Sequence, residues 1–231
     1  MAIDAVIFDL DGVLVDSEPT WDDVRRRYVA DAGGRWADGA ELAMLGMATA
    51  EWSRYVHDEL GVAAPPDEIA EAVIGGMAAR YAADGPPFLP GAVDAVRRIA
   101  ARWPLGLASS SPARLIASTL EAGGLTDSFR VTRSTEQAGA GKPDPAVYLQ
   151  VAEELGVPPE RCAAVEDSTN GIRSAAAAGL RVIAIPTRSF PASDEALARA
   201  AVVLPSLDAL IEAVVDPSAV DPSAVDPSVG A

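Results

Sequence analysis

From Pro90 onward, short apolar runs alternate with segments of helical spacing, and this alternation restricts the fold more than any other feature of the 231-residue chain. Helices are expected between the runs, for example over 145–155. Strands joined in this order by right-handed helical crossovers form a parallel sheet that is covered on both faces. The sequence therefore predicts an α/β fold with strands at 3–8, 105–108, 129–132, 162–165, 182–185 and 201–204.

A helical block interrupts this alternation near the N-terminus. Trp21, Val24 and Tyr28 follow helical spacing, and no strand-like run occurs before the Gly-Pro-Pro stretch at 85–87. We therefore expect an all-helical domain inserted into the α/β core after the first strand. The expected limits are 1–16 and 89–214 for the core and 17–88 for the helical domain.

The C-terminal stretch repeats the unit V-D-P-S-A. Each repeat contains a proline and little apolar bulk, so the segment is a poor core builder. We expect a disordered extension over 215–231.

Composition narrows the range of partners and compartments. The chain has 34 acidic residues against 18 Lys and Arg, and its formal net charge is −16. Such a charge repels polyphosphate backbones, so we expect no nucleic-acid partner. No apolar run reaches membrane-spanning length, no secretory leader is evident, and one cysteine cannot form a disulfide framework. A cytoplasmic monomer without membrane contact is the expectation.

Polar residues follow several of the expected strands. Asp9 and Asp11 follow the first strand, Ser109 follows the second, and Glu166-Asp167 follow a later one. All strands of an open parallel sheet end at the same edge, where ligands bind. Residues far apart in the sequence are therefore expected to converge there.

Each of these signals also has a plain structural interpretation. Two aspartates after a strand are common turn residues, and Ser109-Ser110-Ser111 is a good helix N-cap sequence. Lys142 is the only lysine among the 18 basic residues. It could be a chance survivor of a composition bias, or a position that requires an ammonium group.

Taken together, the carboxylates, the serine hydroxyls and the lysine indicate phosphoryl transfer more specifically than any one of them alone. Clustered carboxylates need a hard cation such as Mg²⁺, which prefers oxygen ligands. A hydroxyl, helix N-terminal amides and an ammonium group suit the growing negative charge on a phosphoryl group. One aspartate could attack phosphorus while the other handles the proton of the leaving group.

Four motifs in order give the chain a resemblance to the haloacid dehalogenase superfamily, in its helical-cap branch of sugar-phosphate phosphatases and β-phosphoglucomutases. The resemblance covers roughly residues 1 to 210. It implies a Rossmann-like core with an inserted helical cap that closes over the site. The motifs are F-D-L-D-G (8–12), L-A-S-S-S (107–111), G-K-P-D-P (141–145) and V-E-D-S-T-N-G-I (165–172).

The resemblance implies a role for each matching residue. Asp9 is expected to be the nucleophile that forms an aspartyl-phosphate and a Mg²⁺ ligand, and Asp11 the general acid/base that offers its backbone carbonyl to the metal. Ser109 and Lys142 are expected to bind the phosphate. The resemblance further implies that Ser110 and Gly12 belong to the substrate-binding segments, with Gly12 permitting the tight turn after the strand, and that Asp167 and Glu166 are metal ligands.

Departures from the family patterns favour hydrolysis. Dehalogenases of this family lack the second aspartate, and Asp11 is present here. Thr49 stands where the mutase branch has a cap arginine for a second phosphate, and Trp21 stands where it has a histidine. Arg54 or Arg80 could supply that charge from another helical turn.

We therefore expect a Mg²⁺-dependent phosphomonoester hydrolase that acts on a small phosphorylated metabolite, such as a sugar or polyol phosphate. The alternatives are a phosphohexomutase, a phosphatase of another small metabolite such as phosphoglycolate, and a non-catalytic binding protein. The run Arg25-Arg26-Arg27 is interpreted as a solvent-exposed helix face.

Overall fold

The computed structural model describes residues 2–44, 47–187 and 191–215. The predicted tail, 215–231, lies outside the described residues apart from Val215. No helix in the described part of the chain combines the length and the apolarity that crossing a bilayer requires.

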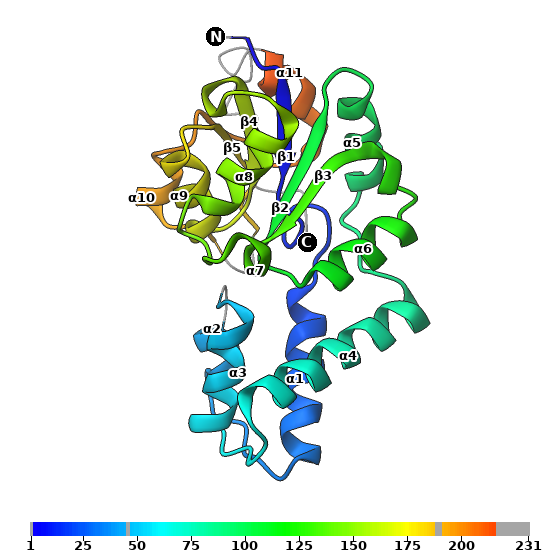
Figure 1. Cartoon of the computed structure of the whole chain (residues 1–231), viewed down its shortest axis with the longest axis vertical. Helices are drawn as coiled ribbons and strands as arrows, with labels where there is room; N and C mark the ends of the chain where they lie inside the picture. Colours follow the sequence, from blue (N-terminus) through cyan, green and yellow to red (C-terminus); the bar gives the residue numbers. More distant parts are fainter. Residues whose placement is uncertain (1, 45–46, 188–190, 216–231) are drawn as a thin grey trace.

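In these residues the core of the protein is a single sheet of six parallel strands in the order β3-β2-β1-β4-β5-β6 (Figure 1). The predicted α/β fold is confirmed. The strands are β1 (Ala5–Phe8), β2 (Leu105–Ser109), β3 (Phe129–Ser134), β4 (Cys162–Glu166), β5 (Arg181–Ala184) and β6 (Val202–Val203).

Two strands extend one residue beyond the apolar runs that predicted them. β2 ends at Ser109 and β4 ends at Glu166, and both polar side chains are fully buried. The Ser109 hydroxyl and the Glu166 carboxylate are hydrogen-bonded within the protein, which offsets the cost of burying them. At the C-terminal edge of the sheet, these two strands therefore continue one residue past their apolar runs, and that last residue is polar.

Helices cover both faces of the sheet. One face packs against α5 (Ala92–Ala100), α6 (Ala113–Ala122) and α11 (Leu210–Val215). The other packs against α8 (Ala146–Leu155), α9 (Thr169–Ala177) and α10 (Asp194–Leu197), and the short α7 (Thr135–Ala138) follows β3. Apolar residues of β1 alternate between the two cores, since Val6 and Phe8 lie in the first and Ala5 and Ile7 in the second.

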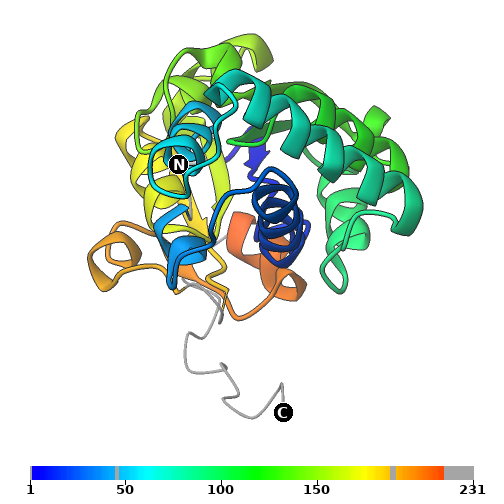
Figure 2. The same cartoon turned by 90° about the horizontal axis from the view of Figure 1, so that it is seen from below.

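A helical unit lies beyond the C-terminal edge of the sheet (Figure 1). It has its own apolar core, which includes both Trp21 and Trp52. Figure 2 shows this unit from below, with α1 viewed nearly along its axis. The limits of the two domains stay a prediction. The helices are α1 (Glu18–Asp31), α2 (Ala40–Met44), α3 (Thr49–Asp58) and α4 (Pro66–Asp84).

Two adjacent segments connect the sheet to the helical unit. Val15 and Phe88 form an antiparallel bridge. The Asp16 amide donates to the Pro87 carbonyl at 2.9 Å, and the Leu89 amide donates to the Leu14 carbonyl at 2.9 Å. The helical unit is therefore attached directly beside the end of β1.

The close approach of α8 to the sheet depends on a glycine in β2. A Cβ atom on Gly106 would lie 2.3 Å from a methyl carbon of Val151 and 3.1 Å from one of Leu155, both in α8. A Cβ on Gly75, within α4, would meet nothing within 4 Å.

We expect Gly106→Ala to lower the free energy of unfolding by about 1–3 kcal/mol, because the added methyl group forces α8 away from the sheet. Gly75→Ala is the matched control, and it is expected to raise the same quantity by about 0.5–1 kcal/mol through helix propensity. Urea unfolding followed by circular dichroism measures both. Equal effects of the two changes would contradict the packing argument.

Candidate active site

The ends of three neighbouring strands form the base of the site. Phe8 in β1 is in register with Leu107 of β2 and with Val165 of β4. The next residues along these strands, Ala108 and Glu166, therefore lie level with Asp9. The register alone brings two carboxylates and a carbonyl group to one place.

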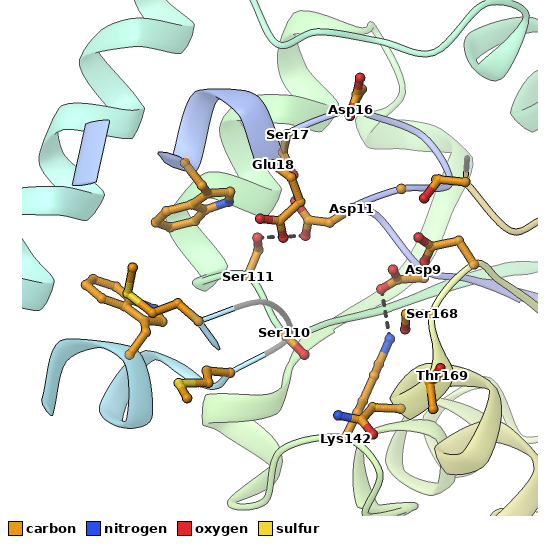
Figure 3. Close-up of a pocket in the computed structure, with 18 of the residues that line it drawn as sticks. Asp9, Asp11, Asp16, Ser17, Glu18, Ser110, Ser111, Lys142, Ser168 and Thr169 are labelled. Atoms are coloured by element: carbon orange, nitrogen blue, oxygen red, sulfur yellow. Dashed lines mark hydrogen bonds and ion pairs between the residues drawn. The ribbon is translucent and has the colours of Figure 1, made fainter. Parts of the chain in front are cut away.

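Lys142 joins these three strand ends. Its Nζ donates to Asp9 Oδ1 at 2.8 Å, to the Ala108 carbonyl at 3.0 Å and to Glu166 Oε1 at 2.6 Å. Its side chain is 6% exposed. An ammonium group has three donors, so each can find an acceptor on a different strand. Figure 3 shows Lys142 reaching Asp9 across the pocket.

Charge balance keeps Lys142 protonated. Burial alone would lower the pKa of Lys142, but the carboxylates of Asp9 and Glu166 raise it above its ordinary value. Burial raises the pKa of Asp9, Lys142 lowers it and Glu166 raises it, with a net rise. The buried cluster therefore has a fixed cation and an excess of acid groups.

The Glu166 carboxylate is held on all sides. Oε1 accepts from Lys142 and from the Tyr148 hydroxyl, the latter at 2.7 Å. Oε2 accepts from the Asp167 amide and from the amide and hydroxyl of Ser168. A Cβ on Gly171 would lie within 2.0 Å of the same carboxylate. These contacts suit a residue that positions Lys142, and the expected role of Glu166 as a metal ligand stays a prediction.

A second acid, Asp167, has an unsatisfied oxygen. Its Oδ1 is buried without a hydrogen-bond partner. Burial, together with Glu166 and Asp9, raises its pKa well above the ordinary value. One ligand oxygen from each of Asp9, Glu166 and Asp167 lies within 4.8 Å of the others. An orphaned carboxylate oxygen in an all-oxygen donor set fits a divalent cation such as Mg²⁺.

Gly12 makes room for Asp167. Its φ is +82°, and a Cβ at this position would lie 2.0 Å from Asp167 Oδ2. The predicted turn role of this glycine therefore coincides with a steric one, because any side chain here would displace a carboxylate of the acidic cluster.

Hydroxyl groups surround Asp11. Ser17 donates to its Oδ1 at 2.5 Å and Ser111 donates to its Oδ2 at 2.8 Å (Figure 3). Ser109 donates to the same Oδ2 at 3.1 Å. Ser17 occupies the N-cap position of α1, yet its side chain makes no capping hydrogen bond. The start of the helical unit is thus tied to an acid that sequence motifs place in the site.

A cavity of about 430 Å³ opens above this cluster, between the sheet edge and the helical unit. Asp9, Asp11, Gly12, Lys142 and Asp167 line its base. This is a typical volume for a small-molecule site.

The three consecutive serines 109–111 lie in different environments. Ser110 and Ser111 line the cavity. Ser109 is fully buried, outside the lining, and it donates to Asp11 while accepting from the Ser111 amide. Phosphate binding by Ser109 stays a prediction, and Ser110 is the serine that faces the cavity without a side-chain hydrogen bond among the described residues (Figure 3).

One sequence-based interpretation is wrong. Arg25 is not solvent-exposed, because it is 5% exposed and lines the cavity from α1. The spacing of Trp21, Arg25 and Val29 on one helix face was the available signal. Neither Arg54 nor Arg80 lines this cavity, and Arg80 pairs with Asp23 and Asp84.

Thr49 and Trp21, the two residues expected at the positions that distinguish the mutase branch, both line the cavity. Thr49 lines it without a charge, and Trp21 lines it beside Arg25. The positioning contacts of Ser17 and Tyr148 were not predicted, because both depend on tertiary neighbours.

Comparisons with known proteins identify the family of the chain. A family model described as haloacid dehalogenase-like hydrolase matches residues 3–179. Hexitol phosphatase B of Escherichia coli is 36% identical over 188 residues, which are 79% of this chain and 83% of the relative. A phosphorylated carbohydrates phosphatase of Thermotoga maritima is 31% identical over 182 residues, covering 78% and 84%.

A solved structure has a similar fold. CbbY from Rhodobacter sphaeroides, as a mutant in complex with xylulose-(1,5)bisphosphate, superposes with a TM-score of 0.81. The two sequences are 27% identical, and the alignment covers 93% of this chain and 99% of the other.

We expect Mg²⁺ to raise the thermal unfolding temperature of the metal-stripped protein by about 5 °C at 100-fold excess over its dissociation constant. The cation relieves the repulsion among buried carboxylates. Asp167→Asn should lose most of this increase, whereas Asp94→Asn, which changes an exposed aspartate of α5, should retain it. Differential scanning fluorimetry with and without EDTA measures the shift, and an equal increase in both variants would contradict the assignment.

Proposed function

The chain belongs to the haloacid dehalogenase-like hydrolase family, and on that premise we propose that it hydrolyses phosphomonoesters of small sugars or polyols through an aspartyl-phosphate on Asp9. The relatives named for hexitol phosphatase and phosphorylated-carbohydrate phosphatase activity support this substrate class.

The observation that carries the proposal is the Lys142–Asp9 contact at the base of the cavity. At 2.8 Å, the ammonium group orients the carboxylate and places a positive charge where a phosphate would lie. Because both side chains are almost fully buried, this charge is poorly screened by water.

The reaction consists of two displacements at phosphorus. In the first, a carboxylate oxygen of Asp9 forms a bond to phosphorus, the ester P–O bond breaks, and Asp11 gives a proton to the departing alkoxide. In the second, Asp11 takes a proton from water, whose oxygen attacks phosphorus. The bond to Asp9 then breaks and inorganic phosphate is released.

A divalent cation held by Asp9, Asp167 and the Asp11 carbonyl would offset the repulsion between the attacking carboxylate and the phosphate dianion. Lys142 and Ser110 bind the phosphate oxygens in this proposal. Ser17, Ser109 and Ser111 fix the Asp11 carboxylate where it can exchange protons with the leaving group or with water. The helical unit supplies the opposite wall and excludes bulk water.

We expect Asp9→Asn to lower kcat/KM for phosphate release by about 10⁴-fold or more, because an amide cannot serve as the nucleophile. A phosphate-release assay over a panel of sugar and polyol phosphates, with and without Mg²⁺, measures the effect. Asp94→Asn is the matched control and should retain wild-type turnover. Persistent turnover by a well-folded Asp9→Asn protein would reject the mechanism.

Hydrolysis and isomerisation give different products from one substrate. With β-glucose 1-phosphate and a glucose 1,6-bisphosphate primer, we expect free phosphate to exceed glucose 6-phosphate. The uncharged Thr49 lines the cavity where a mutase needs an arginine to retain the bisphosphate intermediate. Product analysis by ³¹P NMR separates the outcomes, and predominant glucose 6-phosphate would instead identify a mutase.

A further inference from the structure

Arg25 occupies the cavity wall that faces the proposed phosphate site. Glu18, Trp21 and Arg25 follow one another at i, i+3 and i+7 along α1, so they share one helix face. All three line the same cavity as Asp9 and Lys142. This face is therefore placed to meet the part of a substrate that lies away from its phosphate.

Aromatic rings hold the Arg25 guanidinium. Its Cζ lies 5.0 Å from the ring centroid of Trp21 and 5.3 Å from that of Trp52, and the two rings are 6.0 Å apart. Cation–π contacts fix the position of the group without using its N–H donors. The guanidinium is therefore held at the cavity wall by packing between the two indole rings.

The donors of Arg25 are unused. Its Nε is buried without a partner, and no hydrogen bond or ion pair joins Arg25 to any other residue in the described ranges. A guanidinium has five N–H donors, and buried polar groups are almost always hydrogen-bonded. A side chain that is 5% exposed, lines a cavity and lacks partners is best explained by a ligand that supplies acceptors.

The surrounding charge selects among possible ligands. Burial lowers the pKa of Arg25, and Glu18, Asp22 and Asp11 raise it, so three carboxylates lie within electrostatic reach. Burial raises the pKa of Glu18 to about 7, so a second phosphate here would be repelled mainly by Asp22 and Asp11. A hydroxyl group would not, since it can accept from Arg25 and donate to Glu18. Figure 3 shows Glu18 in the cavity wall near Asp11.

We propose that Arg25 and Glu18 form a subsite that binds the hydroxyl groups of a phosphorylated polyol or open-chain sugar at the end away from the phosphate. The inference rests on the proposed function, since it takes the phosphate end to lie at Asp9 and Lys142. It makes Arg25 a specificity-determining residue and leaves the chemical step to the base of the cavity.

The test compares two substrates of equal chain length, sorbitol 6-phosphate and hexyl phosphate, which differ in the hydroxyl groups. Arg25→Met keeps a long side chain between the indole rings but removes the donors. We expect it to lower kcat/KM for sorbitol 6-phosphate about 10- to 100-fold more than for hexyl phosphate, mainly through KM, as loss of charge-assisted hydrogen bonds predicts.

Two further variants keep the test decisive. Arg27→Met changes an exposed arginine of the same helix and should preserve the wild-type ratio between the substrates. Arg25→Lys keeps the charge and loses the planar fork, so it should reduce the ratio even if Arg25→Met does not fold. Thermal unfolding of each variant reports separately on any loss of the Trp21–Arg25–Trp52 packing.

Equal losses on both substrates would mean that Arg25 serves only packing, and they would overturn the proposal. A larger loss with fructose 1,6-bisphosphate than with sorbitol 6-phosphate would also overturn it, in favour of a second phosphate site. The proposed function fails in a different way, because the wild-type protein would then release phosphate from none of the three substrates, or release it equally after Asp9→Asn.

Discussion

One buried ammonium group organises the site. Lys142 donates hydrogen bonds to two carboxylates and a carbonyl group that the parallel register brings to the ends of β1, β2 and β4. Without this cation, Asp9 and Glu166 would be uncompensated buried acids next to Asp167, which is a strongly unfavourable arrangement. The acids at the ends of the central strands are therefore tolerated only because Lys142 lies between them. The proposed chemistry depends on the same acids.

The second constraint is the link between the sheet and the helical unit. Val15 and Phe88 pair the outgoing and returning segments, and Ser17, the first residue before α1, donates its hydroxyl to Asp11. The residue that starts the helical unit is therefore in direct contact with the acid that is proposed to handle protons.

The sequence predicted what depends on local pattern. Alternating apolar runs located the strands, and the placement of polar residues after them indicated the edge at which Asp9, Asp11 and Asp167 meet. The presence of only one lysine in the chain drew attention to position 142. The sequence could not show that Arg25, the first of three successive arginines, is buried, because its burial depends on Trp52 of another helix. For the same reason the phenol of Tyr148, within an apolar helix face, gave no sign of its contact with Glu166.

The distribution of charge across the cavity links these features to the substrate. At the base, the carboxylates outnumber the single ammonium group, so a phosphate would enter only with a cation that the unsatisfied Asp167 oxygen can help to bind. On the opposite wall, Arg25 and Glu18 line the cavity together, and the two side chains influence each other's pKa. A ligand that is charged at one end and hydroxylated at the other matches both walls, whereas a ligand with a phosphate at each end matches only the base.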